Sequence, residues 1–340
     1  MKYLALLLCL LPLGAAGETP EILLFNWSDY MPREVLQQFM QETGIAVRET
    51  TYDSNEALYA KLKLLGNGGY DVVVPSTYFV DKMRKDGMLL ALDKTKLPNI
   101  QHLDAHHLDK PFDPGNRYSL PYLWGTTGIA VNTAKFPVES VKSWADLWKP
   151  IFRQRLLLPN DMREAFHIGL RVLGYSGNSI DPAQIRQAYE LLRTLLPNVR
   201  IFTSDAIDVQ LVTGEVDVGV AWSGVAGKAH AEDPAIQYVH PQEGVIIWMD
   251  NLAIPKNAPH PELAHRLLDF LLRPDIAQTI TESVGYASPN RTAVQRLKPA
   301  LRDDATAYPR DDILSKGEYQ TDIGAAITLY TEYWERLKAE

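Results

Sequence analysis

Acidic and aromatic side chains recur in this sequence at the ends of strand-like apolar runs. Asp29 and Tyr30 follow the run "ILLFNW", and Asp161 and Glu164 follow "RLLLP". Asp250 interrupts the apolar stretch "VIIWMDNLAIP". A carboxylate buried in apolar surroundings needs a hydrogen-bonding partner or a cation, and aromatic rings attract cations over their faces. These residue types together predict a pocket for a small organic cation.

The candidate residues of this pocket share a position near the carboxyl end of a predicted strand, or in a segment that returns between two halves of the chain. Ligands of open α/β sheets bind beyond the carboxyl ends of strands. The residues so placed are Trp27, Ser28, Asp29, Tyr30, Ser76, Tyr78, Asp161, Glu164, Ser204, Trp222, Trp248 and Asp250.

Several of these residues also have a simpler explanation. Asp161 and Glu164 are three residues apart at a predicted helix start, where Asp161 would cap the backbone amides and Glu164 would reach back in a capping box. Trp222 and Trp248 would serve equally well as core residues. The same acid pair next to tryptophans also leaves open a secreted glycosidase, although the cap explains its spacing without catalysis.

The N-terminus has the pattern of an export signal. Lys2 precedes the apolar run "YLALLLCLLPL" and the small residues "GAAG", where a signal peptidase would cut. The run is shorter than the roughly 20 residues of a membrane-spanning helix. We therefore expect residues 1–17 to be a cleaved signal peptide. Cys9, the single cysteine of the chain, would leave with it, so the mature protein would have no disulfide and no cysteine ligand.

Composition and motifs disfavour several functions. The chain has 34 basic and 42 acidic residues, and this acidic balance argues against binding a nucleic-acid backbone. It contains no HExxH, Walker A, dinucleotide-binding or GxSxG motif, so we expect no reaction and no cofactor. His102, His106 and His107 lie in a stretch with loop signals, which favours a solvated loop over a metal site.

The order of predicted elements indicates an α/β fold. Short β-type runs alternate with amphipathic helical stretches, which is typical of largely parallel sheets with helices on their faces. The stretch "PREVLQQFMQETG" predicts a helix with Val35, Leu36, Phe39 and Met40 facing the core and Gly44 ending it.

The alternation restarts near Thr127 with a predicted strand "GIAVN", which suggests a second lobe. About 320 mature residues exceed the size at which one hydrophobic core keeps growing. We predict a first lobe from residues 18–128 and about 250–310, and a second lobe from residues 129–249. The helical segment 311–340 is expected to pack across both lobes, and two crossings imply a hinge.

Long motifs across the mature chain resemble the periplasmic polyamine-binding proteins of spermidine and putrescine ABC uptake systems. They include "YDVVVPSTYFVDKMRKDGM", "YSLPYLWGTTGIAVN", "GVIIWMDNLAIP" and "SVGYASPN". The resemblance implies a type II periplasmic binding fold, in which two lobes with mixed, mostly parallel sheets close around a ligand. It also implies a periplasmic monomer that uses no cofactor and delivers its ligand to an inner-membrane ABC permease.

The same resemblance implies roles for particular residues. It adds Tyr286 and Gln320 to the candidates named above. By this resemblance Asp250 would hold a central amine, Asp161 and Glu164 would engage ammonium groups, and the aromatic rings would sandwich the methylenes.

Preference between spermidine and putrescine depends on where the additional aminopropyl arm would lie. We expect Ser28, Asp29 and Tyr78 to form the end of the pocket that holds it. Spermidine-preferring relatives read "NWTEY", whereas this chain reads "NWSDY", as putrescine-preferring relatives do. Conversely, Tyr78, Trp248 and Gln320 match the spermidine-preferring pattern. A solute-binding protein for another organic cation and a polyamine sensor remain as alternatives.

Overall fold

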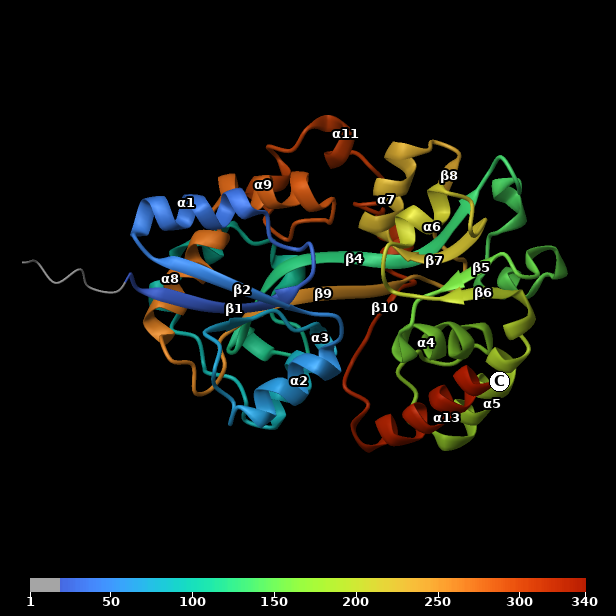
Figure 1. Ribbon diagram of the computed structural model, residues 1–340, viewed down its shortest axis with the longest axis horizontal. Coiled ribbons are helices and arrows are strands. Elements are labelled where there is room, and N and C mark those ends of the chain that lie inside the picture. Colours follow the sequence, from blue (N-terminus) through green and yellow to red (C-terminus); the bar gives the residue numbers. More distant parts are fainter. Residues whose placement is uncertain (1–18) are drawn as a thin grey trace, which may run out of the picture.

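The computed structural model describes residues 19–340, and Figure 1 shows two groups of helices and strands joined through the middle. We call the group that contains the N-terminal strands the first lobe and the other group the second lobe. The predicted signal peptide, residues 1–17, lies outside the described residues. Among the helices of residues 19–340, none combines the length and the apolar character needed to cross a membrane.

The first lobe has helices on both faces of a parallel three-stranded unit. Its elements are β1 (Glu21–Trp27), α1 (Arg33–Thr43), β2 (Ala46–Tyr52), α2 (Asn55–Leu64), β3 (Val72–Val73), α3 (Thr77–Lys85), α8 (Pro261–Leu271), α9 (Pro274–Val284), α10 (Arg291–Val294), α11 (Pro299–Arg302) and α12 (Asp311–Leu314). Strands β2 and β3 both pair with β1 in parallel. Leu24 and Val72 pack toward α1, α8 and α9, whereas Phe25 and Val73 pack toward α2 and α3. The alternation of strand side chains thus gives the lobe a core on each face of its sheet.

Helix α1 shows where the sequence prediction was right and where it was wrong. The helix ends at Gly44, which has a left-handed conformation (φ 70°) and donates its N–H to the carbonyl of Met40. Val35 and Phe39 are buried as predicted, but the side chain of Met40 is 49% exposed. Met40 follows Phe39 by about 100° around the helix axis, which turns it away from the core.

The second lobe repeats this layered arrangement. Its elements are β5 (Leu156–Leu158), α4 (Met162–Val172), α5 (Pro182–Arg193), β6 (Val199–Phe202), α6 (Ile207–Val212), β7 (Val218–Trp222), α7 (Ser223–Glu232), β8 (Ile236–Val239) and α13 (Ile327–Ala339). Strand β5 pairs in parallel with β6 and β7. The C-terminal helix α13 packs against α4 and α5 of this lobe. The segment before it, residues 316–322, contacts both lobes.

Three strands connect the two lobes. They are β4 (Ser119–Asn132), β9 (Ile246–Ala253) and the short β10 (Glu318–Tyr319). Strands β4 and β9 run antiparallel through the middle, and the sheet order is β2-β1-β3-β9-β4-β7-β5-β6. The predicted α/β class is confirmed, and the two lobe sheets join into one sheet through β4 and β9 (Figure 1). Strand β10 pairs with β9 in parallel and adds a third connection to the two that were predicted.

Strand β4 is longer than the sequence prediction, which began near Gly128. Pro121 and Gly125 read as strand breakers in the sequence, but each has a reason to lie within β4. Pro121 lies where the pairing with β9 shifts register, so a missing N–H is tolerated there. A Cβ atom on Gly125 would overlap the ring of Trp248 on the opposite strand.

Candidate functional site

A buried carboxylate on β9 lies at the centre of the candidate site. Asp250 is 7% exposed, and its oxygens accept hydrogen bonds from the Tyr30 hydroxyl at 2.7 Å and from Ser76 Oγ at 2.5 Å. Both donors are neutral, so they do not balance the charge of the carboxylate. Burial raises the pKa of Asp250 to about 6, although these two hydrogen bonds oppose the rise. The first lobe and the crossing strand therefore hold an acid in a fixed orientation that favours a cation.

Aromatic rings lie next to this carboxylate. Tyr30 packs edge to face against Tyr286 with the ring centroids 5.5 Å apart, and Tyr286 packs against Trp248 at 5.2 Å. Gly224 of helix α7 adjoins this group, because a Cβ atom there would overlap the Tyr286 ring. Since α7 belongs to the second lobe and Tyr30 to the first, the rings lie where the lobes meet.

The strand register places a row of residues on one face of the sheet. Residues two apart on a strand share a face, so Trp248 shares the face of Asp250. Across the sheet, Gly125 lies opposite Trp248, and Thr127 lies opposite Trp222 of β7. Directly opposite residues also share a face. The row therefore runs from Asp250 past Trp248 to Thr127 and Trp222. Asp250 and Thr127 are separated by four residues along the strand direction, or about 14 Å at about 3.4 Å per residue.

The acids of the second lobe begin helix α4. Asp161 caps this helix, because its Oδ1 accepts from the N–H groups of Arg163 at 2.8 Å and Glu164 at 3.1 Å. The predicted capping by Asp161 is confirmed, but the Glu164 side chain does not complete a capping box. It faces β4 instead and accepts a hydrogen bond from Thr127 Oγ1 at 3.2 Å. The packing of α4 on the sheet thus directs Glu164 to the row of residues that begins at Asp250.

The carboxyl group of Glu164 is poorly compensated. Its side chain is 4% exposed, and Oε2 has no hydrogen-bonding partner among residues 19–340. Burial and then the neighbouring carboxylate of Asp161 raise the pKa of Glu164 to about 8. Burial also raises the pKa of Asp161. A cation placed between these acids would stabilise their charged forms.

Asn55 is part of the site although it was not among the sequence candidates. Its Oδ1 accepts from the N–H of Ser76 at 3.0 Å, and its Nδ2 donates to Ser76 Oγ at 3.1 Å and to the Tyr78 hydroxyl at 3.2 Å. Helix α2 buries Asn55 together with Leu58 and Leu62. A side-chain amide on the apolar face of a helix needs buried hydrogen-bonding partners. The position of Asn55 on the same helix face as Leu58 and Leu62 could have been recognised from the sequence.

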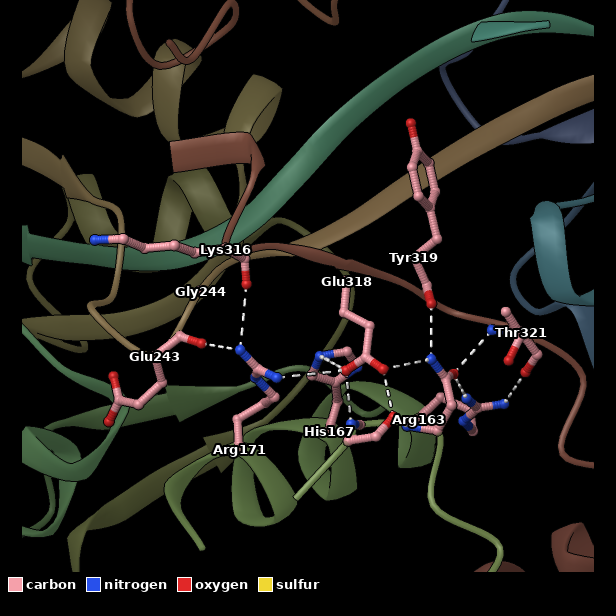
Figure 2. A network of polar contacts seen from close by, with 12 residues as sticks. Arg163, His167, Arg171, Glu243, Gly244, Lys316, Glu318, Tyr319 and Thr321 are labelled. Carbon is pink, nitrogen blue, oxygen red and sulfur yellow. Dashed lines mark hydrogen bonds and ion pairs between the residues drawn. The ribbon is translucent and has the colours of Figure 1, made fainter. Parts of the chain in front are cut away.

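Arg163 was not among the sequence candidates either, because a pocket for a cation is predicted from acidic and aromatic side chains. Its side chain is 1% exposed, and its guanidinium carbon lies 5.2 Å from the centroid of the Tyr78 ring in the other lobe. It donates to Asn178 Oδ1 at 2.9 Å. It also donates to the main-chain carbonyl of Thr321 at 3.1 Å (Figure 2). Its charge opposes the rise in pKa of the two acids that begin α4.

Gln320 comes from the third connection between the lobes. Gln320 is 4% exposed, and its main-chain carbonyl accepts a hydrogen bond from Thr77 Oγ1 at 2.9 Å. Within the described part of the chain, its Nε2 has no hydrogen-bonding partner. The carboxamide of Gln320 thus retains an unused polar atom in a buried position.

The remaining candidates lie nearer the surface. The Trp27 indole N–H donates to the carbonyl of Val74 at 2.9 Å, and this ring is half-buried. Ser28 and Asp29 are exposed in the turn after β1, where Asp29 has a left-handed conformation (φ 55°). Ser204 follows β6 and is partly exposed. A role of Ser28, Asp29 and Ser204 in binding stays a prediction, as it does for the other candidates.

The histidines of "QHLDAHHLDK" lie in two short helical turns, Pro98–His102 and Ala105–His107. His106 is exposed and contacts Asp104, whereas His107 packs on the ring of Trp124. Over residues 19–340 there is no group of three or more histidine, cysteine or acidic side chains that could hold a metal ion.

The joined sheet, with acids and rings from both lobes at their junction, defines a two-lobed binding protein of the α/β class. The chain belongs to the family of bacterial extracellular solute-binding proteins, which its residues 34–309 match. The predicted family resemblance is confirmed.

Individual relatives match nearly the whole chain. The sequence is 49% identical over 324 residues to the spermidine/putrescine-binding periplasmic protein of Escherichia coli (strain K12), which covers 95% of this chain and 93% of that protein. It is 35% identical to a putrescine/agmatine-binding protein of Pseudomonas aeruginosa, over 93% of this chain and 91% of that one. The solved structure of a putative spermidine/putrescine ABC transporter protein from Listeria monocytogenes superimposes with a TM-score of 0.90 at 36% identity, covering 94% of this chain and 98% of that one.

Proposed function

We propose that this protein is a periplasmic polyamine-binding protein that captures spermidine, putrescine or both between its lobes. The observation that carries the proposal is the buried carboxylate of Asp250, whose hydrogen-bonding partners are neutral hydroxyl groups. This carboxylate lies next to aromatic rings. It also shares a face of the sheet with Thr127, which donates a hydrogen bond to Glu164. The names of the relatives described above support the same ligand class.

The chemistry of a polyamine suits this arrangement. Its ammonium groups are separated by methylenes, so it requires acids at intervals with apolar faces between them. A charge-assisted hydrogen bond contributes about 1.5–3 kcal/mol, and a tryptophan face contributes roughly 0.5–2 kcal/mol to a nearby cation. Each buried methylene adds about 0.8 kcal/mol. In the proposal, Asp250 binds one amine, Asp161 and Glu164 bind another, and Trp248 covers the methylenes between them.

The proposed ligand-binding residues come from both lobes and from two of the three connections, β9 and the segment that contains β10. They are Trp27, Ser28, Asp29, Tyr30, Ser76, Tyr78, Asp161, Glu164, Ser204, Trp222, Trp248, Asp250, Tyr286 and Gln320.

Lobe closure follows from the distribution of charge in the proposal. Closure without a ligand buries the carboxyl groups of Asp161 and Glu164 near Asp250, where each must remain charged without a cation or take up a proton, and both disfavour closure. A bound di- or triamine removes this repulsion and contacts both lobes, so it binds the closed state more tightly than the open one. Such a difference in affinity is what shifts a conformational equilibrium.

The proposal also assigns a cellular role. Residues 1–17 direct export and are removed, the mature protein acts as a monomer in the periplasm, and an inner-membrane ABC permease accepts the closed form. No reaction and no cofactor are involved. The glycosidase alternative is disfavoured because Asp161 is committed to capping α4.

Titration calorimetry with putrescine, spermidine, spermine and agmatine tests the proposal. We expect binding of spermidine or putrescine, and no binding of 1,4-butanediol, which has the putrescine carbon chain without its charges. Failure of all four amines to bind, or equal binding of the diol, would contradict the proposal.

A further inference from the structure

The third connection between the lobes is held in place mainly by side chains of the second lobe. Glu318 of β10 accepts hydrogen bonds from the N–H of Gly177 at 2.8 Å and from the hydroxyl of Ser176. Figure 2 shows Glu318 above α4, where its carboxylate also lies 3.7 Å from Nη1 of Arg171. These contacts fix where the connection leaves the second lobe.

Asn178 binds the main chain on both sides of Gln320. Its Nδ2 donates to the carbonyl of Tyr319 at 2.8 Å, and its Oδ1 accepts from the N–H of Thr321 at 2.8 Å. One side-chain amide therefore satisfies the residue before Gln320 and the residue after it, in the manner of a neighbouring strand. This pairing fixes the direction in which the side chain of Gln320 leaves the backbone.

Arg163 sets the orientation of the Asn178 amide. A guanidinium group only donates hydrogen bonds, so the atom that faces Nη2 of Arg163 at 2.9 Å must be the amide oxygen of Asn178. The amide nitrogen then faces the carbonyl of Tyr319. Nη1 of Arg163 also donates to the main-chain carbonyl of Thr321 at 3.1 Å. This is a third hydrogen bond from the second lobe to residues 319–321.

The first lobe holds Gln320 from the opposite side. Thr77 Oγ1 donates to the main-chain carbonyl of Gln320 at 2.9 Å, and Thr77 follows Ser76, which donates to Asp250. The position of Gln320 is thus determined jointly by both lobes. Its buried Nε2 has no partner among residues 19–340. Because this atom is a donor, the carboxamide turns by half a rotation about its last bond to present the acceptor Oε1 to an ammonium group.

We propose that Asn178, oriented by Arg163, is a positioning residue that places the carboxamide of Gln320 so that its oxygen, Oε1, accepts a hydrogen bond from an ammonium group of the bound polyamine. Asn178 itself touches the third connection rather than the ligand. This inference rests on the proposed function, and it names a residue outside the predicted site that determines how tightly the site binds.

A double-mutant cycle tests this inference. Calorimetry with spermidine would compare the unaltered mature protein with Asn178→Ala, Gln320→Ala and the double variant. Loss of one hydrogen bond to a charged group predicts about tenfold weaker binding for each single variant. If Asn178 acts through Gln320, the double variant binds about as tightly as Gln320→Ala alone, because neighbouring residues in one network are not additive.

Two results would overturn the inference. One is unchanged affinity in Asn178→Ala. The other is a double variant whose loss equals the product of the two single losses, since that would show that Asn178 and Gln320 act independently.

Control variants separate positioning from a general loss of stability. Gln187→Ala removes an exposed amide of the same lobe that accepts from the Tyr175 hydroxyl, and we expect it to leave the affinity unchanged. A tenfold loss there would overturn the inference. If Asn178→Ala does not fold, as thermal unfolding without ligand would show, Asn178→Asp replaces it. This variant keeps an acceptor for the N–H of Thr321 and loses the donor to the carbonyl of Tyr319, so we expect a smaller loss of affinity than for Asn178→Ala. In the Gln320→Ala background this loss of affinity should disappear. Additive losses would contradict the inference.

Failure of the inference and failure of the proposed function are distinguishable. If the unaltered protein binds no polyamine, the proposed function is wrong. If it binds spermidine and the Asn178 variants bind equally well, only the positioning role is wrong.

Discussion

Asp250 and Glu164 are both buried acids beside aromatic rings, but their surroundings differ. Both oxygens of Asp250 accept hydrogen bonds from hydroxyl groups, and its pKa rises to about 6 because of burial. Glu164 has one such bond, from Thr127, and an adjacent carboxylate, and its pKa rises to about 8. At neutral pH, Asp250 is therefore mostly ionised without a ligand, whereas Glu164 is mostly protonated.

This difference assigns separate tasks to the two acids. Asp250 offers a preformed negative charge in the first lobe and its crossing strand. In the proposed function, Glu164 of the second lobe would become charged when an ammonium group arrives, so binding there would release a proton. Asp250 would bind the first ammonium group, and Glu164 would bind the second one when the lobes close. Lobe closure would then depend on the presence of a second amine in the ligand.

Removing the charge of Asp250 is expected to have the largest effect. The change Asp250→Asn keeps the size of the side chain and removes the charge, and loss of one partner of a buried charge pair typically costs 2–5 kcal/mol. We expect roughly 100-fold weaker binding of every polyamine by calorimetry at pH 7.5. The exposed Asp303→Asn, which alters a surface pair with Arg302, serves as the control and should bind normally. Affinity retained in Asp250→Asn would remove this residue from the site.

The stability of the ligand-free protein should show the same raised pKa. A carboxyl group whose folded pKa lies above its unfolded pKa contributes stability at low pH and loses it as the pH rises through the folded value. For Asp250, a rise from 3.8 to about 6 corresponds to a contribution on the order of 3 kcal/mol that is lost between pH 4 and 7. The unfolding free energy of Asp250→Asn in urea should therefore rise relative to the unaltered protein over this range. A difference that stays constant with pH would contradict the raised pKa.

Glu164→Gln should weaken binding in a way that depends on pH. Because the pKa of Glu164 is raised to about 8, its charge is fully available only above that pH. We expect the variant to bind spermidine about tenfold more weakly than the unaltered protein at pH 8.5. At pH 6 we expect nearly equal affinities, because each pH unit below the pKa lowers the affinity advantage of the ionised glutamate by up to tenfold. A ratio of affinities that does not change between these pH values would show that Glu164 is not the acid that ionises on binding.

The smallest expected effect concerns the exposed turn after β1. Asp29→Glu lengthens this side chain by one methylene, and we expect the ratio of spermidine to putrescine affinity to increase about threefold, a shift of roughly 0.6 kcal/mol. The matched control is Asp312→Glu, at a residue that forms a surface ion pair with Arg310. This change should leave the ratio of spermidine to putrescine affinity unaltered. Equal ratios in both variants would place the choice of ligand elsewhere.

The sequence indicated the α/β class and Asp250 because both leave local signals. Alternation of runs reveals the class, and an acid inside an apolar run stands out. The contribution of Thr127 could not be read locally, because it depends on the register of β4 with β7 and on the side of α4 that faces the sheet. Strand β10 has only two residues, so its pairing with β9 leaves almost no pattern.

Arg163 and Asn178 were hidden for a different reason. Arg163 lies between two acids in the sequence and looks like part of a solvated, charged helix start, yet it is buried against Tyr78 of the other lobe. Asn178 lies in a polar turn, and its partners at residues 319 and 321 are more than 140 positions away. Neither partnership has a local signature.

The most direct measurement of the central claim is a crystal structure of the mature protein with spermidine. The account predicts one ligand nitrogen within about 3 Å of the Asp250 carboxylate, another within about 3 Å of Glu164, and methylenes against the Trp248 ring. A ligand bound elsewhere, or one that contacts a single one of these acids while the other faces solvent, would contradict it.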